Sequence, residues 1–257
     1  MNRTKIIVAL FPAILLIGCA SEPSPEPVRA VAPAPIPAPQ EMRERVVEIG
    51  RSVDGHPIPM HVFGSSAHPI LILGGLHGNE KNSAECTTLL LEYLRGHPGE
   101  MHGVSIAIIP AANPDGLSRG IRFNTHRVDL NRNFPATNWI KMYSGGRAAT
   151  SEPETQALVA TIQNLQPRRI LSIHSIMGPP CNNYDGPAMA LAYAMAAKNG
   201  YPVKDSVGYA TPGSLGSWAG VDLHIPIITL ELPFALPGPD GWARNRQAIL
   251  AFIRGAE

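Results

Sequence analysis

The chain has 257 residues, of which 44% are hydrophobic and 16% charged, and its formal net charge is +1. This length and composition suit a globular protein with a sizeable core. No basic run stands out, so nucleic acid is excluded as a partner, and we find no internal repeat.

Residues 1–18 are predicted to be a lipoprotein signal peptide. A charged start precedes an apolar stretch over 6–17, which is too short for a permanent membrane span and has the flanks of a secretory signal. The stretch ends in Leu16-Ile17-Gly18-Cys19, which resembles a bacterial lipobox and predicts lipidation of Cys19. Ala20 rather than Asp follows, and the resemblance to sorted lipoproteins then implies a cell-envelope lipoprotein that faces the periplasm, in the outer membrane rather than the inner. An ordinary signal peptide with an incidental cysteine is the alternative.

Residues 19–40 are predicted to form an extended tether. Between positions 20 and 40 there are seven prolines, which fix φ and remove backbone donors, so this segment cannot pack a core. It could reach on the order of 60 Å from the membrane, enough for an anchored enzyme to touch the cell wall; a mere spacer is the alternative. Residues 41–257 suffice for one domain. That domain holds Cys86 and Cys181, and two cysteines do not establish a bridge.

The apolar pattern of residues 41–257 alternates between strands and helices. A hairpin is expected around Asp54-Gly55, and Ser151-Glu152-Pro153-Glu154 is typical of a capping box that opens a helix. Continuous apolar strands that alternate with helices predict an α/β domain with a mostly buried sheet. The expected strands are 46–49, 58–63, 69–73, 104–109, 169–173 and 225–230, and the expected helices are 83–94, 151–165, 188–198 and 239–254.

Two histidines and a glutamate predict a catalytic metal centre. His77-Gly78-Asn79-Glu80 directly follows the apolar strand 69–73, and His174 lies at the end of another apolar run. Two imidazoles and one carboxylate form a three-ligand zinc set that leaves the fourth position open to water. Zinc-bound water ionises near neutral pH, so a hydrolase is predicted. Glu231 also follows an apolar strand, and active groups of such sheets gather outside the strand ends, so a shared site is expected.

Two polar segments lie between these motifs. Asn113-Pro114-Asp115-Gly116 has the composition of a turn. The segment 128–135 is charged and rich in amides, which suits neither a helix nor a core strand. Within it, Asn131 and Arg132 can form a fork for a substrate carboxylate, because a guanidinium binds a carboxylate through two bonds. A surface loop with an exposed salt bridge is the alternative.

Taken together, the motifs occur in the order of the zinc metallocarboxypeptidase family, and the sequence most resembles the bacterial murein peptide amidases within it. The resemblance spans residues 50–233, nearly the whole domain. It rests on His77-x-x-Glu80, Asn113-Pro-Asp-Gly116, Arg122, the segment 128–139, Ser151 to Leu158, His174-Ser175, the segment 206–218 and Glu231.

The resemblance implies a single domain with a mixed sheet of about eight strands and helices on both faces. It implies one Zn²⁺ per chain, held by His77, Glu80 and His174. Glu231 would be the general base, and a desolvated carboxylate at that position has the raised pKa that this role needs. A strand-end glutamate paired with an arginine is the alternative. Arg122 would stabilise the oxyanion.

The same resemblance implies how substrate is held. Asn131 and Arg132 would grip the free carboxylate beside the scissile bond. Asp129 would orient the first zinc histidine by accepting a hydrogen bond from its other ring nitrogen. The residues expected to line the pocket are Gly213, Ser214 and Ser217.

Two features depart from the pattern. Asn79 stands where the murein amidases have Asp, which changes the local charge but not the ligands. The tyrosine that pancreatic-type members close over substrate has no located counterpart, and Tyr201 and Tyr209 are the candidates.

The implied activity is zinc-dependent hydrolysis of the γ-D-glutamyl–meso-diaminopimelate amide of murein peptides. The expected partners are the murein peptide and, through lipidated Cys19, the membrane; no protein partner is evident. The first alternative is a carboxypeptidase that removes ordinary C-terminal L-amino acids. The others are a deacylase of N-acyl amino acids and a non-catalytic wall-binding lipoprotein.

Overall fold

The computed structural model describes residues 44–101 and 103–255. The predicted signal peptide, Cys19 and the tether lie outside the described residues. Within the described ranges, no helix has the length and the apolar character needed to cross a bilayer.

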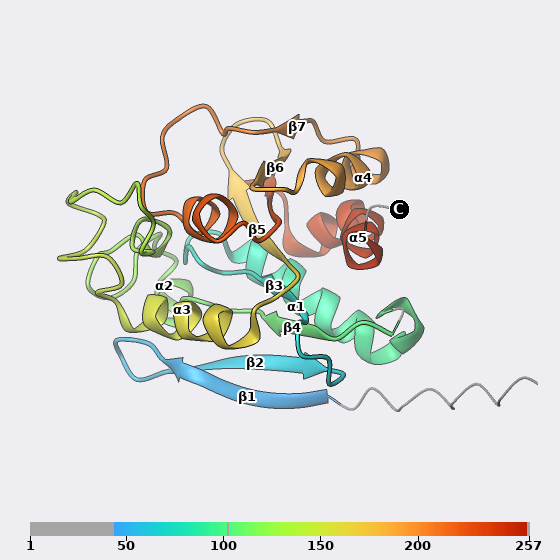
Figure 1. The fold of residues 1–257 in the computed structure, drawn as a ribbon, viewed down its shortest axis with the longest axis horizontal. Coiled ribbons are helices and arrows are strands. Elements are labelled where there is room, and N and C mark those ends of the chain that lie inside the picture. The colour runs from blue at the N-terminus through green and yellow to red at the C-terminus, as the bar shows by residue number, and fades with distance from the viewer. Residues whose placement is uncertain (1–43, 102, 256–257) are drawn as a thin grey trace, which may run out of the picture. The chain divides into compact units, whose positions relative to one another are not determined.

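A mixed sheet of eight strands runs through the described part of the domain (Figure 1). The strand order is β1-β2-β4-β3-β5-β8-β6-β7. The central strands β4, β3, β5 and β8 are parallel, whereas β2 and β6 run antiparallel to their neighbours β4 and β8. The strands are β1 (Glu44–Arg51), β2 (Pro57–Phe63), β3 (Ile70–Leu73), β4 (Ile106–Ile109), β5 (Arg169–Ile176), β6 (Cys181–Asp185), β7 (Val203–Lys204) and β8 (Ile227–Pro233).

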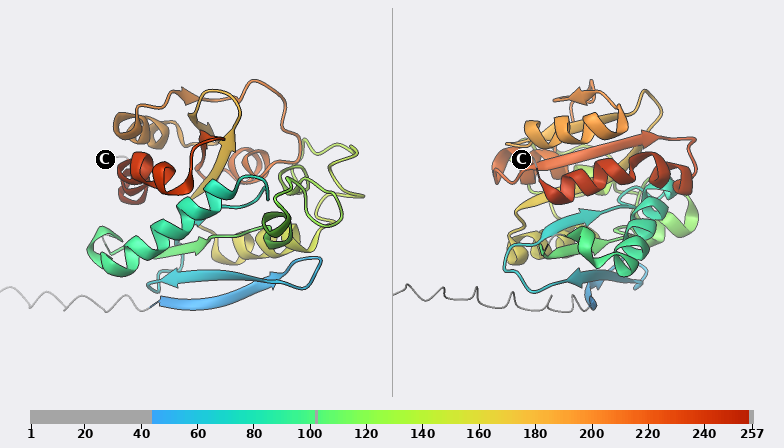
Figure 2. Two further views of the ribbon diagram at one scale, coloured as in Figure 1. Left: turned by 180° about the vertical axis from the view of Figure 1, so that it is seen from behind. Right: turned by 90° about the vertical axis from the view of Figure 1, so that its right-hand side faces the viewer.

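Helices cover both faces of this sheet, as predicted (Figure 2). On one face, α1 (Lys81–Gly96), α4 (Met189–Asn199) and α5 (Gly238–Arg254) share a hydrophobic cluster with the strands. On the other face, α3 (Pro153–Leu165) and the π-helix η3 (Gly216–Asp222) share a second cluster. The shorter helices are η1 (Pro98–Met101), α2 (Pro114–Arg119) and η2 (Leu130–Arg132).

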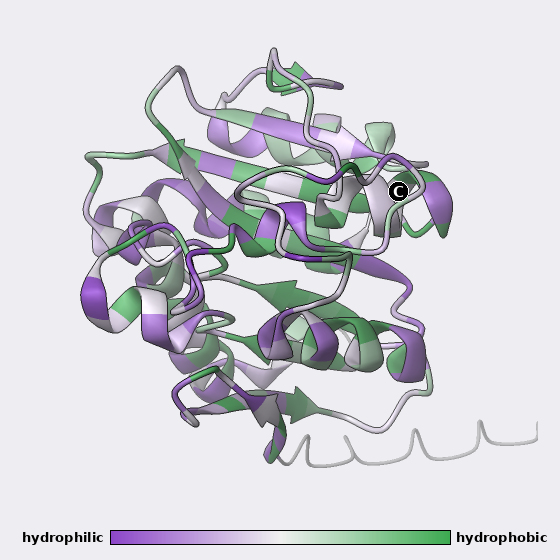
Figure 3. Cartoon of the chain, turned by 90° about the vertical axis from the view of Figure 1, so that its left-hand side faces the viewer, coloured by the Kyte–Doolittle hydropathy of each residue, from purple (hydrophilic) through white to green (hydrophobic). Residues whose placement is uncertain are grey.

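The central strands are apolar on both faces because both faces are covered (Figure 3). In β3, Ile70 and Ile72 belong to the first cluster, and Leu71 and Leu73 belong to the second. This is the two-residue alternation of a strand with both sides packed.

The carboxyl ends of the parallel strands meet at one edge of the sheet, where ligands bind in such folds. His77 follows the end of β3. His174 and Glu231 lie inside β5 and β8, where they pair in register. The prediction that both fall beyond their strands is therefore wrong. The β5–β8 pairing continues past the apolar run of each strand, and the His174 and Glu231 side chains line a cavity instead of entering the core.

Two local predictions are also corrected. The capping box is absent, because α3 begins at Pro153 with Glu152 as its N-cap and no side-chain cap bond. Asn113-Pro-Asp-Gly116 is not a simple turn but the start of α2, where the Asn113 side chain accepts from the Gly116 N–H. Cys86 and Cys181 are both buried and free.

Candidate metal centre and substrate cavity

His77, Glu80 and His174 converge at the edge of the sheet. Oε1 of Glu80 lies 2.7 Å from Nδ1 of His77, and Oε2 lies 3.1 Å from Nδ1 of His174. The two Nδ1 atoms are 3.2 Å apart, and all three residues are buried. Two imidazole nitrogens and a carboxylate that face one point are the donor set of a catalytic zinc ion. The residues present therefore fit such an ion.

Asp129 orients the first of these histidines. Its Oδ1 lies 3.0 Å from Nε2 of His77, and its Oδ2 accepts from Nε of Arg122 at 2.9 Å. A carboxylate at Nε2 keeps the proton on that nitrogen and leaves Nδ1 free to bind a metal. Arg122 also places Nη1 3.4 Å from Oε1 of Glu80, so its guanidinium lies beside the ligand cluster.

Backbone contacts fix the loop that carries His77 and Glu80. A Cβ at Gly78 would lie 1.9 Å from the carbonyl carbon of Gly116, so the loop is pressed against the start of α2. The Gly78 N–H donates to the carbonyl of Arg122 at 3.3 Å. From β5, the Ser175 N–H donates to Oε2 of Glu80 at 2.9 Å. Three distant segments thereby hold the ligand loop in place.

The cluster has strongly shifted pKa values in the protein alone. Burial by itself would lower the pKa of His77, but Glu80 and Asp129 raise it to about 9. Burial would raise the pKa values of Glu80 and Asp129, yet the neighbouring His77 lowers both well below their usual range. Two carboxylates held in their charged form around an imidazolium suit a divalent cation that displaces the proton.

Glu231 lines the same cavity and is only 8% exposed. Burial raises its pKa, and the nearby His174 opposes that rise. Among the described residues Glu231 makes no ion pair, so the alternative of a strand-end glutamate paired with an arginine is not what the structure shows.

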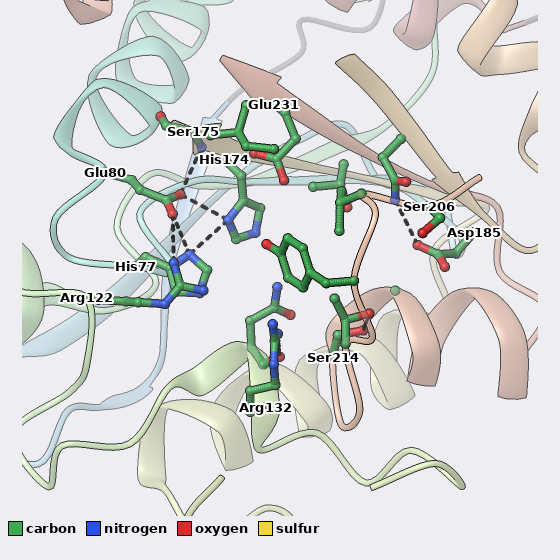
Figure 4. A pocket seen from close by; sticks show the side chains of 18 of the residues that line it. His77, Glu80, Arg122, Arg132, His174, Ser175, Asp185, Ser206, Ser214 and Glu231 are labelled. Carbon is green, nitrogen blue, oxygen red and sulfur yellow. Dashed lines mark hydrogen bonds and ion pairs between the residues drawn. The ribbon is translucent and has the colours of Figure 1, made fainter. Parts of the chain in front are cut away.

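The ligands open into a cavity of about 120 Å³ whose two ends differ in charge. Glu80, His77 and Arg122 lie at one end, and Asp185 and Ser206 lie at the opposite end (Figure 4). Asp185 has no ion-pair partner within the described ranges, and burial raises its pKa. Its carboxylate accepts a long bond of 3.5 Å from the amide of Asn183.

Asn131 and Arg132 both line the cavity. Oδ1 of Asn131 accepts from the Leu215 N–H at 2.9 Å, which leaves its amide N–H groups for a ligand. Nη1 of Arg132 donates to the carbonyl of Asn131 at 2.7 Å. Together they place cationic and amide donors between the two ends.

Of the three further residues predicted to line the pocket, only Ser214 does so. Gly213 instead lies in a turn behind Arg132. Its φ is +68, and a Cβ at this position would come within 2.7 Å of the Arg132 carbonyl oxygen. Ser217 lies beneath Ser214, and its N–H donates to the Ser214 hydroxyl. Both residues shape the cavity wall from behind.

A second group with metal-binding side chains consists of Asp54 and His56, which are exposed, and Asp115, which is buried. Asp54 is paired with Arg119, and Asp115 accepts bonds from Ser52 and from the Asp54 N–H. These bonds tie the β1–β2 turn to α2, which is a structural role.

Comparison with known proteins identifies the family. The family profile described as zinc carboxypeptidase matches residues 39–237. The chain belongs to the zinc carboxypeptidase family. It is therefore a hydrolase that acts on peptide bonds, and the family implies zinc at the donor set described above.

Similar zinc carboxypeptidases include murein peptide amidase A of Escherichia coli K12, which is 36% identical over 204 residues, covering 72% of this chain and 79% of that protein. Murein peptide amidase A of Vibrio campbellii is 34% identical over 205 residues, covering 72% and 77%. The crystal structure of murein-tripeptide amidase MpaA from E. coli O157 superimposes with a TM-score of 0.67 at 30% identity, covering 82% of this chain and 92% of that one.

More distant structures share the fold alone. Bovine thrombin-activatable fibrinolysis inhibitor, in complex with a tick carboxypeptidase inhibitor, has a TM-score of 0.69 at 19% identity and covers 82% of this chain and 89% of that one. The predicted zinc carboxypeptidase-like fold is confirmed.

The structure separates the two candidate tyrosines of this zinc carboxypeptidase. Tyr209 lines the cavity and is 58% exposed. Tyr201 packs against the α4 and α5 side of the core, where its hydroxyl accepts from Asn245. Tyr209 is thus the tyrosine that can reach a substrate.

Sequence reasoning missed Asp185, Asn183 and Asn82. Asp185 and Asn183 lie on β6, whose Cys-Asn-Asn-Tyr-Asp sequence has no apolar pattern. A detectable signal for Asn82 was its place two residues after the ligand Glu80, at the start of a helix. Asn79, between the ligands, has a buried Oδ1 without a partner in the described structure.

Proposed function

We propose that this zinc carboxypeptidase hydrolyses the amide bond between γ-D-glutamate and meso-diaminopimelate in murein peptides. The observation that carries the proposal is the charge distribution of the cavity, with Arg122 beside the ligands, Arg132 between the two ends and unpaired Asp185 at the far end. Within the peptide, diaminopimelate has one carboxylate beside the scissile bond, and the end of its side chain carries an ammonium and a second carboxylate. The first carboxylate suits the arginines and the ammonium suits Asp185. The relatives named murein peptide amidase A support the same substrate.

In this proposal each residue has one task. A bound zinc ion, held by the His77–Glu80–His174 set, supplies a polarised carbonyl and an acidified water. Glu231 accepts the proton of the attacking water and delivers it to the nitrogen of diaminopimelate as the C–N bond breaks. Arg122 donates to the oxyanion that develops as the carbonyl carbon becomes tetrahedral.

Arg132 and the amide of Asn131 hold the substrate carboxylate, which fixes the scissile bond over the metal centre. Asp129 keeps His77 in the ligating tautomer. Tyr209, at the cavity mouth, is the side chain that covers the bound peptide.

A second candidate is favoured by the same unpaired carboxylate. Asp185 also suits the side chain of a C-terminal lysine or arginine, so a carboxypeptidase that removes basic L-amino acids would use an identical cavity.

The test incubates zinc-loaded protein with L-Ala-γ-D-Glu-meso-diaminopimelate and, separately, with a blocked dipeptide that ends in L-Lys. Mass spectrometry then measures free diaminopimelate and free lysine, with a chelated sample as control. Metal-dependent release of diaminopimelate alone supports the proposal. Release of lysine alone would transfer the assignment to the basic carboxypeptidase, and no release from either peptide would refute both.

We also propose that the enzyme is a lipoprotein that lipidated Cys19 anchors in the outer membrane, with the domain facing the periplasm. The lipobox-like sequence and the proline-rich residues 20–40 support this location. Labelled palmitate should be incorporated into the wild type and not into Cys19→Ala. An unlabelled wild type that remains soluble would refute the anchor.

A further inference from the structure

Asn82 is a buried amide in the first turn of α1, two residues after Glu80. Its side chain is bonded at both polar atoms. Nδ2 donates to the carbonyls of Pro233 at 3.2 Å and Leu236 at 2.9 Å, and Oδ1 accepts from the Ser175 hydroxyl at 2.5 Å. A primary amide offers two donors and an acceptor in one small plane, which no carboxylate or hydroxyl side chain does.

These three bonds join the elements that carry the reacting groups. Ser175 directly follows His174 on β5. Pro233 ends β8, two residues after Glu231, and begins a turn that closes with a bond from the Leu236 N–H to the Pro233 carbonyl. Pro233 and Pro237 have no N–H, so this turn has few donors of its own with which to anchor itself. The Asn82 side chain on α1 instead donates two hydrogen bonds to the turn, at the carbonyls of Pro233 and Leu236.

The metal donors do not depend on this link. Glu80 is bonded directly to the Ser175 N–H at 2.9 Å and lies against both imidazoles, while His77 is held by Asp129. The segment that follows Glu231 is held differently. Leu232 and Pro233 pair with β5, the Phe234 N–H donates to the Ile176 carbonyl, and the Gly238 N–H donates to Glu85. The turn carbonyls of Pro233 and Leu236 are tied to α1 by the amide of Asn82.

We propose that Asn82 is a positioning residue that sets the place of Glu231 relative to the metal ligands. Without it, the turn after β8 relaxes and the Glu231 carboxylate moves, while the His77–Glu80–His174 set stays assembled. Displacement of a reacting group by about 1 Å costs on the order of 100-fold in rate, so a small shift suffices. The inference concerns peptide-bond hydrolysis by this fold and holds for either substrate considered above.

The test replaces Asn82 by Asp, which keeps the shape but turns a carboxylate oxygen toward two carbonyl oxygens. Asn245→Asp is the matched control, because Asn245 is also buried and also makes three bonds, to Gly241, Tyr201 and Asn199, away from the cavity. Full-length protein is assayed on both peptides named above. A wild type inactive on the murein peptide would refute that substrate, and the lysine peptide then reports on Asn82.

For Asn82→Asp we expect kcat to fall about 10- to 100-fold, the usual effect of losing a residue that orients a reacting group. KM, zinc content and the rise in Tm on zinc addition should match the wild type. Asn245→Asp should lower Tm and leave kcat unchanged.

Equal kcat in the two variants would overturn the proposal, since Asn82 would then be a structural residue only. Loss of zinc from Asn82→Asp would also overturn it, because the effect would run through the ligands. If Asn82→Asp does not fold, Ser175→Ala cuts the same link from the β5 side by removing one hydroxyl. Unchanged kcat in that variant overturns the proposal, and a fall in kcat at constant zinc content supports it.

Discussion

Glu231 and Asp185 are carboxylates of one cavity with different neighbours. Glu231 lies beside the metal-binding imidazoles, whereas Asp185 lies against the glycines of η3. A Cβ at Gly216 would come within 2.3 Å of the Asp185 carboxylate, so glycine at that position makes the space. Burial raises the pKa of both groups, but only Glu231 has cationic neighbours that oppose the rise. Glu231 is therefore suited to proton transfer, and Asp185 is suited to pairing with a cation.

Replacing Glu231 by Gln should abolish general-base catalysis. We expect kcat to fall about 10²- to 10⁴-fold at constant KM and constant zinc content, because the amide has the same shape and no basic oxygen. In the wild type, kcat/KM should decline as pH falls through the pKa of Glu231, which burial raises above the ordinary value of a glutamate. If the variant retained the wild-type kcat, Glu231 would not be the general base.

Replacing Asp185 by Asn should change selectivity. For a murein tripeptide, kcat/KM should fall about 30-fold, equivalent to about 2 kcal/mol for a lost charge-assisted contact. A peptide that ends in 2-aminopimelate, which lacks the distal ammonium, should be unaffected. Steady-state kinetics on the two peptides measures this. An equal loss on both would mean that Asp185 maintains the cavity and does not read the ammonium.

At the scale of elements, the loop after β3 and the start of α2 meet backbone to backbone at Gly78 and Gly116. No other residue type fits at Gly78, since a Cβ would overlap the neighbouring carbonyl. The contact connects the loop that carries His77 and Glu80 with the segment that leads to Arg122.

Gly78→Ala should therefore separate these two segments. We expect a destabilisation of at least about 1–3 kcal/mol, the usual cost of overpacking, together with weaker zinc binding. Gly96→Ala is the control, because nothing lies within 4 Å of a Cβ there and alanine favours the helix by about 0.5–1 kcal/mol. Calorimetry and competition with a chromophoric chelator measure both effects. Zinc affinity unchanged in Gly78→Ala would contradict the assigned role of the contact.

The elements that the sequence predicted are those with apolar periodicity. The cores of β3, β5 and β8 and most of α1, α3, α4 and α5 were identified, because their faces are buried. β6 and the short β7 were missed, since they are defined by hydrogen bonds, of β6 to β8 and of β7 to β6, and not by apolar packing. α2 and η3 were missed because turn-forming residues and glycines open them, and tertiary contacts decide their conformation.

The residues of the site also divide into those that sequence motifs identified and those that only the fold brings together. His77, Glu80, His174, Asp129, Arg122, Asn131, Arg132 and Glu231 were all named from the sequence, and the structure brings them to one edge of the sheet. Their roles remain predictions. Asp185 was not named, because a single aspartate in a polar strand carries no pattern. Its significance comes from Gly216 and Gly220, more than 30 positions away in the chain.

At the scale of the whole molecule, the metal centre couples folding to proton binding. In the metal-free protein Glu80 and Asp129 raise the pKa of His77 to about 9, above the ordinary histidine value of 6.5. Since the folded pKa is the higher one, this stabilisation is complete below pH 6.5 and is lost as pH rises through 9. Zinc takes the place of that proton, so the loaded protein should not share this loss.

Chelated protein should thus show a Tm that falls between pH 6.5 and 9, while zinc-loaded protein shows a much smaller change. At free zinc about 1,000-fold above its Kd, the metal should add about 4 kcal/mol to stability. Scanning calorimetry across this pH range tests both statements. Parallel pH curves with and without zinc would mean that His77 is not the group that zinc replaces.

The two thiols described above bear on how the enzyme matures. Cys86 lies on α1 and Cys181 on β6, both are free, and burial raises their pKa values to about 12 and about 11. Thiols in this state react slowly with oxidants, because the thiolate is the reactive form. Within the described residues, then, the fold needs no oxidant and no disulfide isomerase. The described domain should therefore reach the same native state under oxidising and reducing conditions, and Cys86 and Cys181 should react only after unfolding in both.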